Sequence, residues 1–401
     1  MCKITLIRIN LNKISPLFVI DLNRVNFGLS KINLNKIKVH MRSNFSVMLV
    51  TIVTALIFTS CNDSEESGYD IPNAYNFENV DYSGQSTRIA MLTELVNYAK
   101  TANAGAVLDA SKLQAMYENS GSPFNSEALN TASKDLKSKT FELDQPLIES
   151  FIVKLAQDSQ SAGAIGANGR AGVVSSNDGS KTYLFDEKGY EYIQLVEKGL
   201  MGACFYYQIM GVYLTEEKIG EAVDNIEVTA GLGTNMEHHW DEAFGYISLP
   251  TNFPNQDQEL LFWGKYIQGR EENLSSGSKL MSAFITGRAA ISAKDMDTKN
   301  EMVDIIYTEL ELMAGATAIH YINSALNNYT DDALRNHALS EAWVFSNNLQ
   351  YNPKKVISTQ EVLEARTLLG ENFYEVSRAD LIAARTILAS TLGLSSVSEQ
   401  L

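Results

Sequence analysis

The sequence is poor in cysteine, proline and basic residues, and each shortage excludes a class of protein. Three cysteines in 401 residues exclude a disulfide scaffold and a zinc site built from cysteines. Seven prolines, without long alternating runs, argue against a β-sandwich or a propeller. Binding to nucleic acid needs a clustered basic face that neutralises phosphates, and the formal net charge is −16, so we expect no nucleic-acid partner.

Common catalytic motifs are missing as well. The chain contains no His-Glu-x-x-His, no Gly-x-Ser-x-Gly, no phosphate loop and no dinucleotide fingerprint. Cys204 lies in an apolar segment, where packing is a better explanation than nucleophilic chemistry. Apolar residues make up 45% of the chain, which is enough for a sizeable core.

The segment that begins at Met41 resembles a bacterial lipoprotein signal. A short basic start is followed by residues 45–59, which are apolar apart from serine and threonine and are short for a bilayer span. Residues 58–61 (Phe-Thr-Ser-Cys) resemble a lipobox, with Phe in place of the usual Leu. The resemblance implies cleavage before Cys61 and a lipid, including palmitate, on that residue. The alternative is an uncleaved membrane anchor.

The flanking segments complete this N-terminal organisation. Residues 1–40 show no settled helical or strand period, and we interpret them as a mis-set start outside the native protein. Residues 41–60 are the signal peptide, and residues 61–80 form a flexible acidic tether. From Cys61 onward the net charge is −23, which suits a protein held at a membrane surface. We expect an outer membrane lipoprotein on the periplasmic or the cell-surface face.

Beyond the tether, apolar residues recur at helical spacing. The pattern predicts an all-α fold of up-and-down helical bundles, two of them packed together, over residues 81–395. We place a soft boundary that gives halves 81–230 and 231–395. The glycine-rich stretch 159–180 is expected to be a flexible connection. Later helices are predicted near 258–270, 278–293, 300–325, 332–348, 359–368 and 378–390.

Two short segments share the pattern His, three residues, Glu, Ala, aromatic, any residue, aromatic. They carry His238 with Glu242 and, 99 positions later, His337 with Glu341. On a helix, residues four apart lie on one face, so each segment can aim an imidazole and a carboxylate at one point. His239 is three residues before Glu242, which is also a same-face spacing on a helix. The sequence leaves open which of the two adjacent histidines, His238 or His239, faces inward.

Two such helices packed face to face would supply two histidines and two glutamates to one metal ion. The competing interpretation is a pair of buried hydrogen bonds at a helix crossing. His320 lies on an apolar helical face, where a core histidine is favoured over a supporting ligand.

These motifs carry a family resemblance. Residues 237–246, with residues 192–200 upstream and residues 337–343 downstream, resemble the domain of unknown function 4856 over nearly all of the chain after Cys61. That family is similar in turn to imelysin-like proteins. The second likeness implies paired helical bundles, a cell-envelope setting, a link to iron acquisition, and a Gly-x-His-x-x-Glu metal motif.

The match to the imelysin-like motif is partial. His239 and Glu242 match its His-x-x-Glu, whereas Glu237 stands at the glycine position. Imelysin-like proteins have also been grouped with metallopeptidases, for which this chain lacks His-Glu-x-x-His.

The leading hypothesis is a lipid-anchored, imelysin-like protein that binds iron, zinc or an iron-bearing ligand, haem included, for uptake. The ligands would be His238 or His239, Glu242, His337 and Glu341. The alternatives are a metallohydrolase with one carboxylate as general base, and a surface interaction module whose His/Glu pairs are structural. Under the leading hypothesis, the partners of the protein would be the membrane, through the lipid on Cys61, and a metal or small-molecule ligand.

Overall fold

The described part of the chain is predominantly helical. The computed structural model describes residues 68–255 and 259–401. Its α-helices are α2 (Ser83–Lys100), α3 (Ala110–Glu118), α4 (Glu127–Asn130), α5 (Gln145–Ser159), α6 (Tyr192–Leu200), α7 (Glu216–Ile219), α8 (Asn235–Ile247), α9 (Phe262–Leu274), α10 (Ser276–Ala293), α11 (Met296–Asn327), α12 (Asp332–Asn348), α13 (Thr359–Leu368) and α14 (Arg378–Thr391). The predicted all-α class is confirmed.

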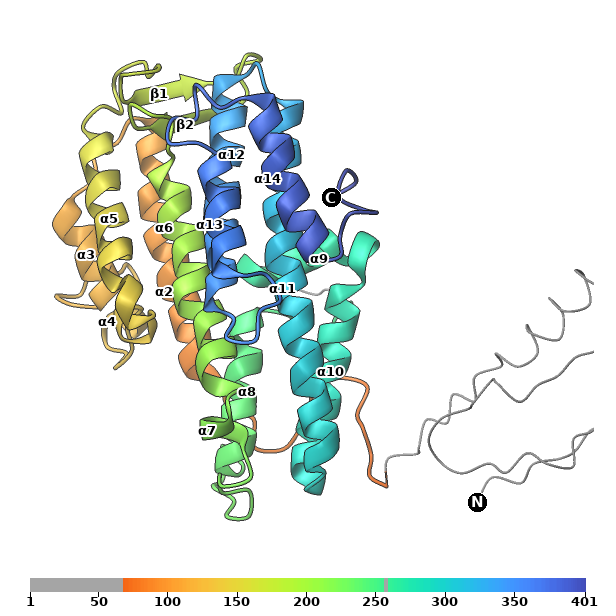
Figure 1. The fold of residues 1–401 in the computed structure, drawn as a ribbon. Helices are drawn as coiled ribbons and strands as arrows, with labels where there is room; N and C mark the ends of the chain where they lie inside the picture. Colours follow the sequence, from red (N-terminus) through yellow and green to blue (C-terminus); the bar gives the residue numbers. More distant parts are fainter. Residues whose placement is uncertain (1–67, 256–258) are drawn as a thin grey trace, which may run out of the picture. The chain divides into compact units, whose positions relative to one another are not determined.

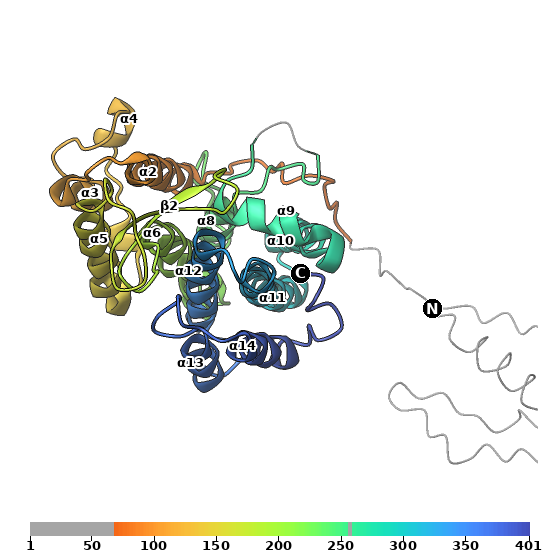
Figure 2. The same ribbon diagram turned by 90° about the horizontal axis from the view of Figure 1, so that it is seen from above.

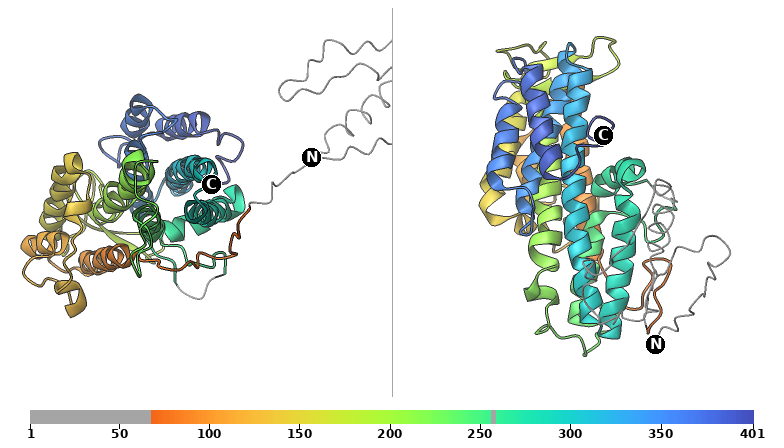
Figure 3. Two further views of the ribbon diagram at one scale, coloured as in Figure 1. Left: turned by 90° about the horizontal axis from the view of Figure 1, so that it is seen from below. Right: turned by 45° about the vertical axis from the view of Figure 1, so that its right-hand side comes forward.

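Three consecutive helices form the framework of the bundle. Residues 294–295 join α10 to α11 and residues 328–331 join α11 to α12, and such short connections make neighbouring helices antiparallel. Helix α11 packs along both neighbours and also against α14. Figure 2 looks along the helices and shows α6 beside α12, with α13 and α14 on one side of them, and the left view of Figure 3 shows the same bundle from the opposite end.

Helix α6 continues into two π-helical segments, η6 (Met201–Tyr206) and η7 (Gln208–Tyr213). The π-helix is rare and is often found at functional sites. Within η6, Gly202 lies so close to the Asn348 side chain of α12 that a Cβ atom would overlap it. The missing side chain of Gly202 therefore lets the backbone of this helix lie against the Asn348 side chain of α12.

The glycine-rich stretch that was expected to be a flexible connection instead contains a strand. Strand β1 (Gly172–Ser175) pairs antiparallel with β2 (Thr182–Phe185). The loop of this hairpin is bound to the start of α12, because the backbone N–H of Asn177 donates to the Asp331 carboxylate at 2.7 Å. Figure 1 shows the hairpin at the end of the bundle where α12 begins, and α7 toward the opposite end.

The hydrophobic core is continuous across residue 230, where the sequence suggested a soft boundary between two halves. Helix α8, which follows that point, packs against α2 and η7, which precede it, and against α10. The described residues 68–255 and 259–401 belong to one compact unit. Two buried tryptophans link distant elements: Trp240 Nε1 donates to the Phe284 carbonyl at 3.0 Å, and Trp263 Nε1 donates to the Met201 carbonyl at 2.9 Å. Among the described residues, no helix has the length and apolar character needed to cross a membrane.

Candidate functional site

Helix α8 begins at a capping box. The Thr234 side chain accepts a hydrogen bond from the Glu237 backbone N–H at 3.2 Å, and the Glu237 carboxylate accepts one from the Thr234 backbone N–H at 2.9 Å. This reciprocal pair satisfies two backbone donors that would otherwise be free at the helix start. It therefore fixes the register in which His238 and Glu242 lie one turn apart.

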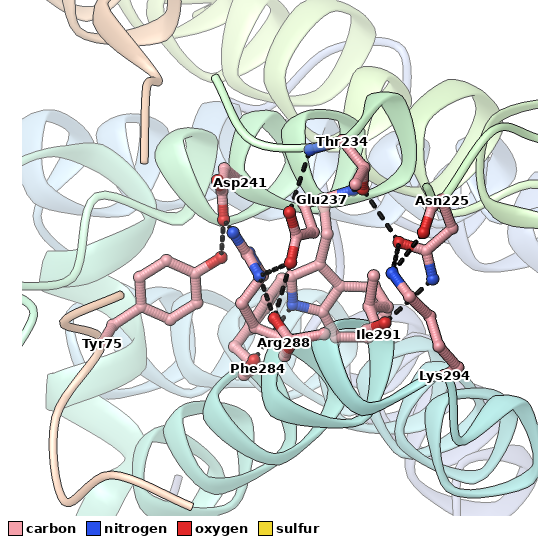
Figure 4. Close-up of polar contacts among 11 residues, drawn as sticks. Tyr75, Asn225, Thr234, Glu237, Asp241, Phe284, Arg288, Ile291 and Lys294 are labelled. Carbon is pink, nitrogen blue, oxygen red and sulfur yellow. Dashed lines mark hydrogen bonds and ion pairs between the residues drawn. The ribbon is translucent and has the colours of Figure 1, made fainter. Parts of the chain in front are cut away.

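A buried ion cluster fixes the inner face of α8 against α10. Arg288 donates from Nη1 to Glu237 Oε1 at 2.7 Å and from Nε to Asp241 Oδ1 at 2.9 Å, and Tyr75 Oη donates to the same Asp241 oxygen at 2.5 Å (Figure 4). Burial raises the pKa of Asp241 to about 7, although the neighbouring Arg288 and Tyr75 lower it. With this face directed to the core, His238 and Glu242 lie on a face that solvent reaches in part.

The side chains of His238, His239 and Glu242 make up what we call the α8 centre. His238 Nε2 lies 3.9 Å from Glu242 Oε2, and the two side chains are 27% and 20% exposed. The other glutamate oxygen, Oε1, accepts hydrogen bonds from Gln85 Nε2 and Tyr213 Oη, both at 3.0 Å. Two neutral donors thus hold one oxygen of Glu242 and leave the other facing His238.

His239 has a fixed tautomer. Its Nδ1 lies 2.7 Å from the Lys218 backbone carbonyl, which can only accept, so the proton is on Nδ1 and Nε2 carries a lone pair. Burial lowers the pKa of His239, while the carbonyl opposes that effect. A neutral imidazole held through its other nitrogen is the usual arrangement of a metal-binding histidine.

The second motif, which we call the α12 motif, consists of His337 and Glu341 on α12 and has different surroundings. His337 Nδ1 lies 2.6 Å from Glu191 Oε2 and its Nε2 lies 3.4 Å from Glu341 Oε1, so the ring is held between two carboxylates. The Tyr183 ring stacks on it at 4.3 Å between centroids. Burial lowers the pKa of His337, but Glu191 and Glu341 outweigh burial and raise it above the ordinary value. The carboxylates therefore favour the imidazolium form.

Glu341 is also engaged by protein groups. Tyr266 Oη donates to Glu341 Oε2 at 3.1 Å, and the positive charge of Lys198 acts on the same site. Lys198 in turn pairs with Glu197 at 2.5 Å, and Glu197 pairs with Lys100 at 3.0 Å. The charges alternate in sign along this chain, which ends at the 47% exposed Lys100, so protein cations balance the carboxylates around the α12 motif.

The two motifs do not meet. His337 contacts Tyr183 of β2 and Glu191, the residue before α6, at the hairpin end of the bundle, whereas His239 contacts α7 toward the other end (Figure 1). The continuous helix from α6 to η7 runs between them. In residues 68–255 and 259–401, no group of three or more His, Cys, Asp or Glu residues is arranged to hold a metal ion.

The remaining predicted residues are separate from the α8 centre. His320 is half-buried on α11, where burial and then Arg270 lower its pKa, while a hydrogen bond with the Leu401 backbone and the charge of Glu341 oppose them. Cys204 is buried in η6, and burial raises the pKa of its thiol to about 12, as suits a packing residue. Cys61 lies outside the described residues.

Sequence reasoning missed the partners that orient these motifs. Gln85, Tyr213 and Glu191 lie far from α8 and α12 in the sequence, and none belongs to a recognisable motif. Only the tertiary packing brings their polar atoms to Glu242 and to His337.

The fold defines a helical-bundle protein with polar centres between its helices. A family model for the domain of unknown function DUF4856 matches residues 72–371, and the chain belongs to that family. The predicted family resemblance is thereby confirmed, whereas the likeness to imelysin-like proteins stays a prediction. Neither the curated proteins nor the solved structures contained a match.

Proposed function

We propose that this protein is a lipid-anchored cell-envelope protein that binds a metal ion, iron or zinc or an iron-bearing ligand, at the α8 centre and serves in its acquisition. One observation carries the proposal. His238 Nε2 and Glu242 Oε2 are 3.9 Å apart without a hydrogen bond between them, which two ligands bonded at about 2.1 Å to one ion can match.

Tautomer and charge favour the α8 centre over the α12 motif. His239 has a lowered pKa and a lone pair on Nε2, as a metal ligand requires. His337 has a raised pKa and lies between two carboxylates. A metal ion at the α12 motif would have to displace the proton that those carboxylates stabilise, whereas a metal ion at His239 displaces none.

The proposed location rests on residues 41–61 of the sequence. A signal that ends in a lipobox would attach a lipid to Cys61, and residues 62–67 would connect that lipid to the helical unit. Excess acidic charge would concentrate cations near the surface of the protein.

Metal analysis of two matched variants tests the proposal. Residues 62–401, purified without a histidine tag, are loaded with iron or zinc, dialysed and analysed by elemental mass spectrometry. We expect near-stoichiometric metal in the parent and in Glu341→Ala, and none in Glu242→Ala. Loss of metal in Glu341→Ala alone would move the site to α12. Circular dichroism of each variant separates ligand loss from misfolding.

The charges around His337 are neutralised by other side chains of the protein. This favours a second candidate, an interaction module whose His/Glu pairs are structural. For that candidate, parent and both variants would contain no metal. Chelators and added metal would then leave the thermal midpoint of the parent unchanged.

A further inference from the structure

The loop between α7 and α8 exposes apolar side chains. We call residues 221–233 the tip loop. Ile226 and Val228 are 79% and 63% exposed, and Ala222 and Ala230 are exposed as well. Figure 1 shows the loop projecting from the end of the bundle opposite the hairpin. A single exposed apolar side chain is ordinary, whereas several on one projecting loop are typical of an interaction surface.

Hydrogen bonds fix the shape of the tip loop. Asp224 Oδ1 accepts a hydrogen bond from the Ile226 backbone N–H at 3.1 Å, and the Asp224 carbonyl accepts one from the Met236 backbone N–H at 3.1 Å. The backbones of Thr229 and Gly233 exchange two hydrogen bonds, at 2.8 and 2.9 Å. Because these backbone groups are bound in this conformation, the exposure of Ile226 belongs to the folded loop.

The tip loop is bound to the place where the described chain begins. Lys294 Nζ donates to the backbone carbonyl of Asn225 and, at 3.0 Å, to its side-chain oxygen (Figure 4). The next residue, Asp295, accepts a hydrogen bond from Tyr69 Oη at 2.9 Å. Residues 294–295 therefore contact both the residue before Ile226 and the second residue of the described chain.

The same N-terminal segment leads to the proposed lipid. Cys61 precedes Tyr69 by eight residues, which span at most about 29 Å when fully extended. Ile71, two residues after Tyr69, is 40% exposed. Further along, Asn79 Oδ1 accepts a hydrogen bond from the Gly231 backbone N–H of the tip loop at 2.8 Å. A lipid on Cys61 would therefore keep the tip loop within reach of the bilayer surface.

The charges of the tip loop select the kind of bilayer. Residues 221–233 contain three acidic residues, Glu221, Asp224 and Glu227, and no lysine or arginine. An anionic lipid surface would repel these carboxylates. A zwitterionic surface has no net charge, so burial of apolar side chains at the boundary between headgroups and acyl chains can hold the loop there.

We propose that the tip loop rests on a zwitterionic phospholipid surface, with Ile226 and Val228 inserted at the headgroup boundary. The inference rests on the lipid anchor of the proposed function and adds the orientation of the anchored protein. The hairpin end of the bundle points away from the bilayer. Helix α7, whose Lys218 carbonyl holds His239, lies on the membrane side, so the α8 centre is nearer to the bilayer than the α12 motif (Figure 1).

Fluorescence of the tethered protein tests the inference. Residues 61–401 are coupled through Cys61 to a maleimide lipid in phosphatidylcholine vesicles, and Cys204 is buried from the reagent. Ile226→Trp places a reporter on the tip loop. The matched control is Ile165→Trp, at a 77% exposed residue that pairs with Val173 of β1. We expect brominated phosphatidylcholine to quench the fluorescence that Ile226→Trp adds to the parent, and to leave that of Ile165→Trp unchanged.

Two further changes separate insertion from mere proximity. Val228→Asp in the Ile226→Trp protein removes one inserted side chain and adds a charge, so the quenching should be lost. Replacing part of the phosphatidylcholine with phosphatidylglycerol should weaken the quenching, because the tip loop is acidic.

The outcomes separate this inference from the proposed function. Equal quenching at both ends of the bundle, no quenching at residue 226, or stronger quenching with phosphatidylglycerol would each overturn the inference. A blue shift of the Ile226→Trp fluorescence without vesicles, growing with protein concentration, would assign the tip loop to a second copy of the chain instead. Chemical coupling supplies the anchor in every sample, so failure of palmitate labelling at Cys61 in cells would defeat the proposed lipid anchor without changing these results. Metal analysis tests the α8 centre separately.

Discussion

At the scale of single residues, two copies of one motif have become chemically different. His239 is neutral and half-exposed with a carbonyl on its far nitrogen, whereas His337 is held between two carboxylates. The intrahelical spacing of His and Glu is the same in both. The groups that approach from other helices determine protonation, and protonation decides whether the imidazole can bind a metal.

His337 should make stability depend on pH in a defined direction. Its pKa is raised in the folded state, so its contribution is fully present below the unfolded value of 6.5 and is lost as pH rises through the folded value. We expect the difference in unfolding free energy between the parent and His337→Gln to shrink as pH rises from below 6.5 into the alkaline range. Urea unfolding across that range measures it, and a constant difference would contradict the prediction.

Substitution of Arg288 should lower the free energy of unfolding more than most single substitutions do. Arg288→Met leaves Glu237 and Asp241 buried without their cation, which costs about 3 to 5 kcal/mol for a broken buried pair. The control is Lys354→Met, because Lys354 and its partner Asp304 are 54% and 71% exposed, and the loss of this pair should cost less than about 1 kcal/mol. Chemical denaturation of both variants gives the comparison, and equal losses would show that the buried cluster is not special.

At the scale of elements, local sequence and packing act together. The capping box fixes the start of α8, but the ion cluster with Arg288 and Tyr75 decides which face of the helix is buried. Likewise η6 can lie against Asn348 of α12 only because Gly202 has no side chain at the point of contact. A helix in this bundle is therefore specified by its neighbours as much as by its own residues.

Two glycine substitutions should have opposite effects. Gly202→Ala places a methyl group against Asn348 in the core and should destabilise the protein by about 1 to 3 kcal/mol, as overpacking does. Gly269→Ala, on α9 with no neighbouring atom within 4 Å of the added carbon, should stabilise it by about 0.5 to 1 kcal/mol. Thermal unfolding of both variants checks the two signs, and a stabilising Gly202→Ala would refute the close-packing argument.

At the scale of the whole molecule, the helical unit is expected to be the part displayed from a lipid anchor. Cys61→Ser should abolish incorporation of labelled palmitate and move the protein from the membrane to the soluble fraction, because a lipidated cysteine would be its attachment. Cys2→Ser is the control, since residue 2 precedes the expected start at Met41. Labelling that persists in Cys61→Ser would contradict the predicted lipobox.

Much of the helical architecture could be predicted from the sequence. The segments 332–348 and 359–368 coincide with α12 and α13, because an apolar stripe at helical spacing forces one face toward a core. The β-hairpin escaped prediction, since its strands have four residues each and the first lies within glycine-rich sequence. Patterns this short do not distinguish a strand from a loop.

The sequence by itself determined the helices, the family, and the pairing of each His with the Glu one turn away, because these depend on local spacing. Only the tertiary structure decided that the two pairs lie in different parts of the bundle and meet different partners. Glu191 reaches His337 and Tyr213 reaches Glu242 across long stretches of chain. Which helix faces are buried together is fixed by the packing of the whole unit, and spacing along a single helix carries no information about it.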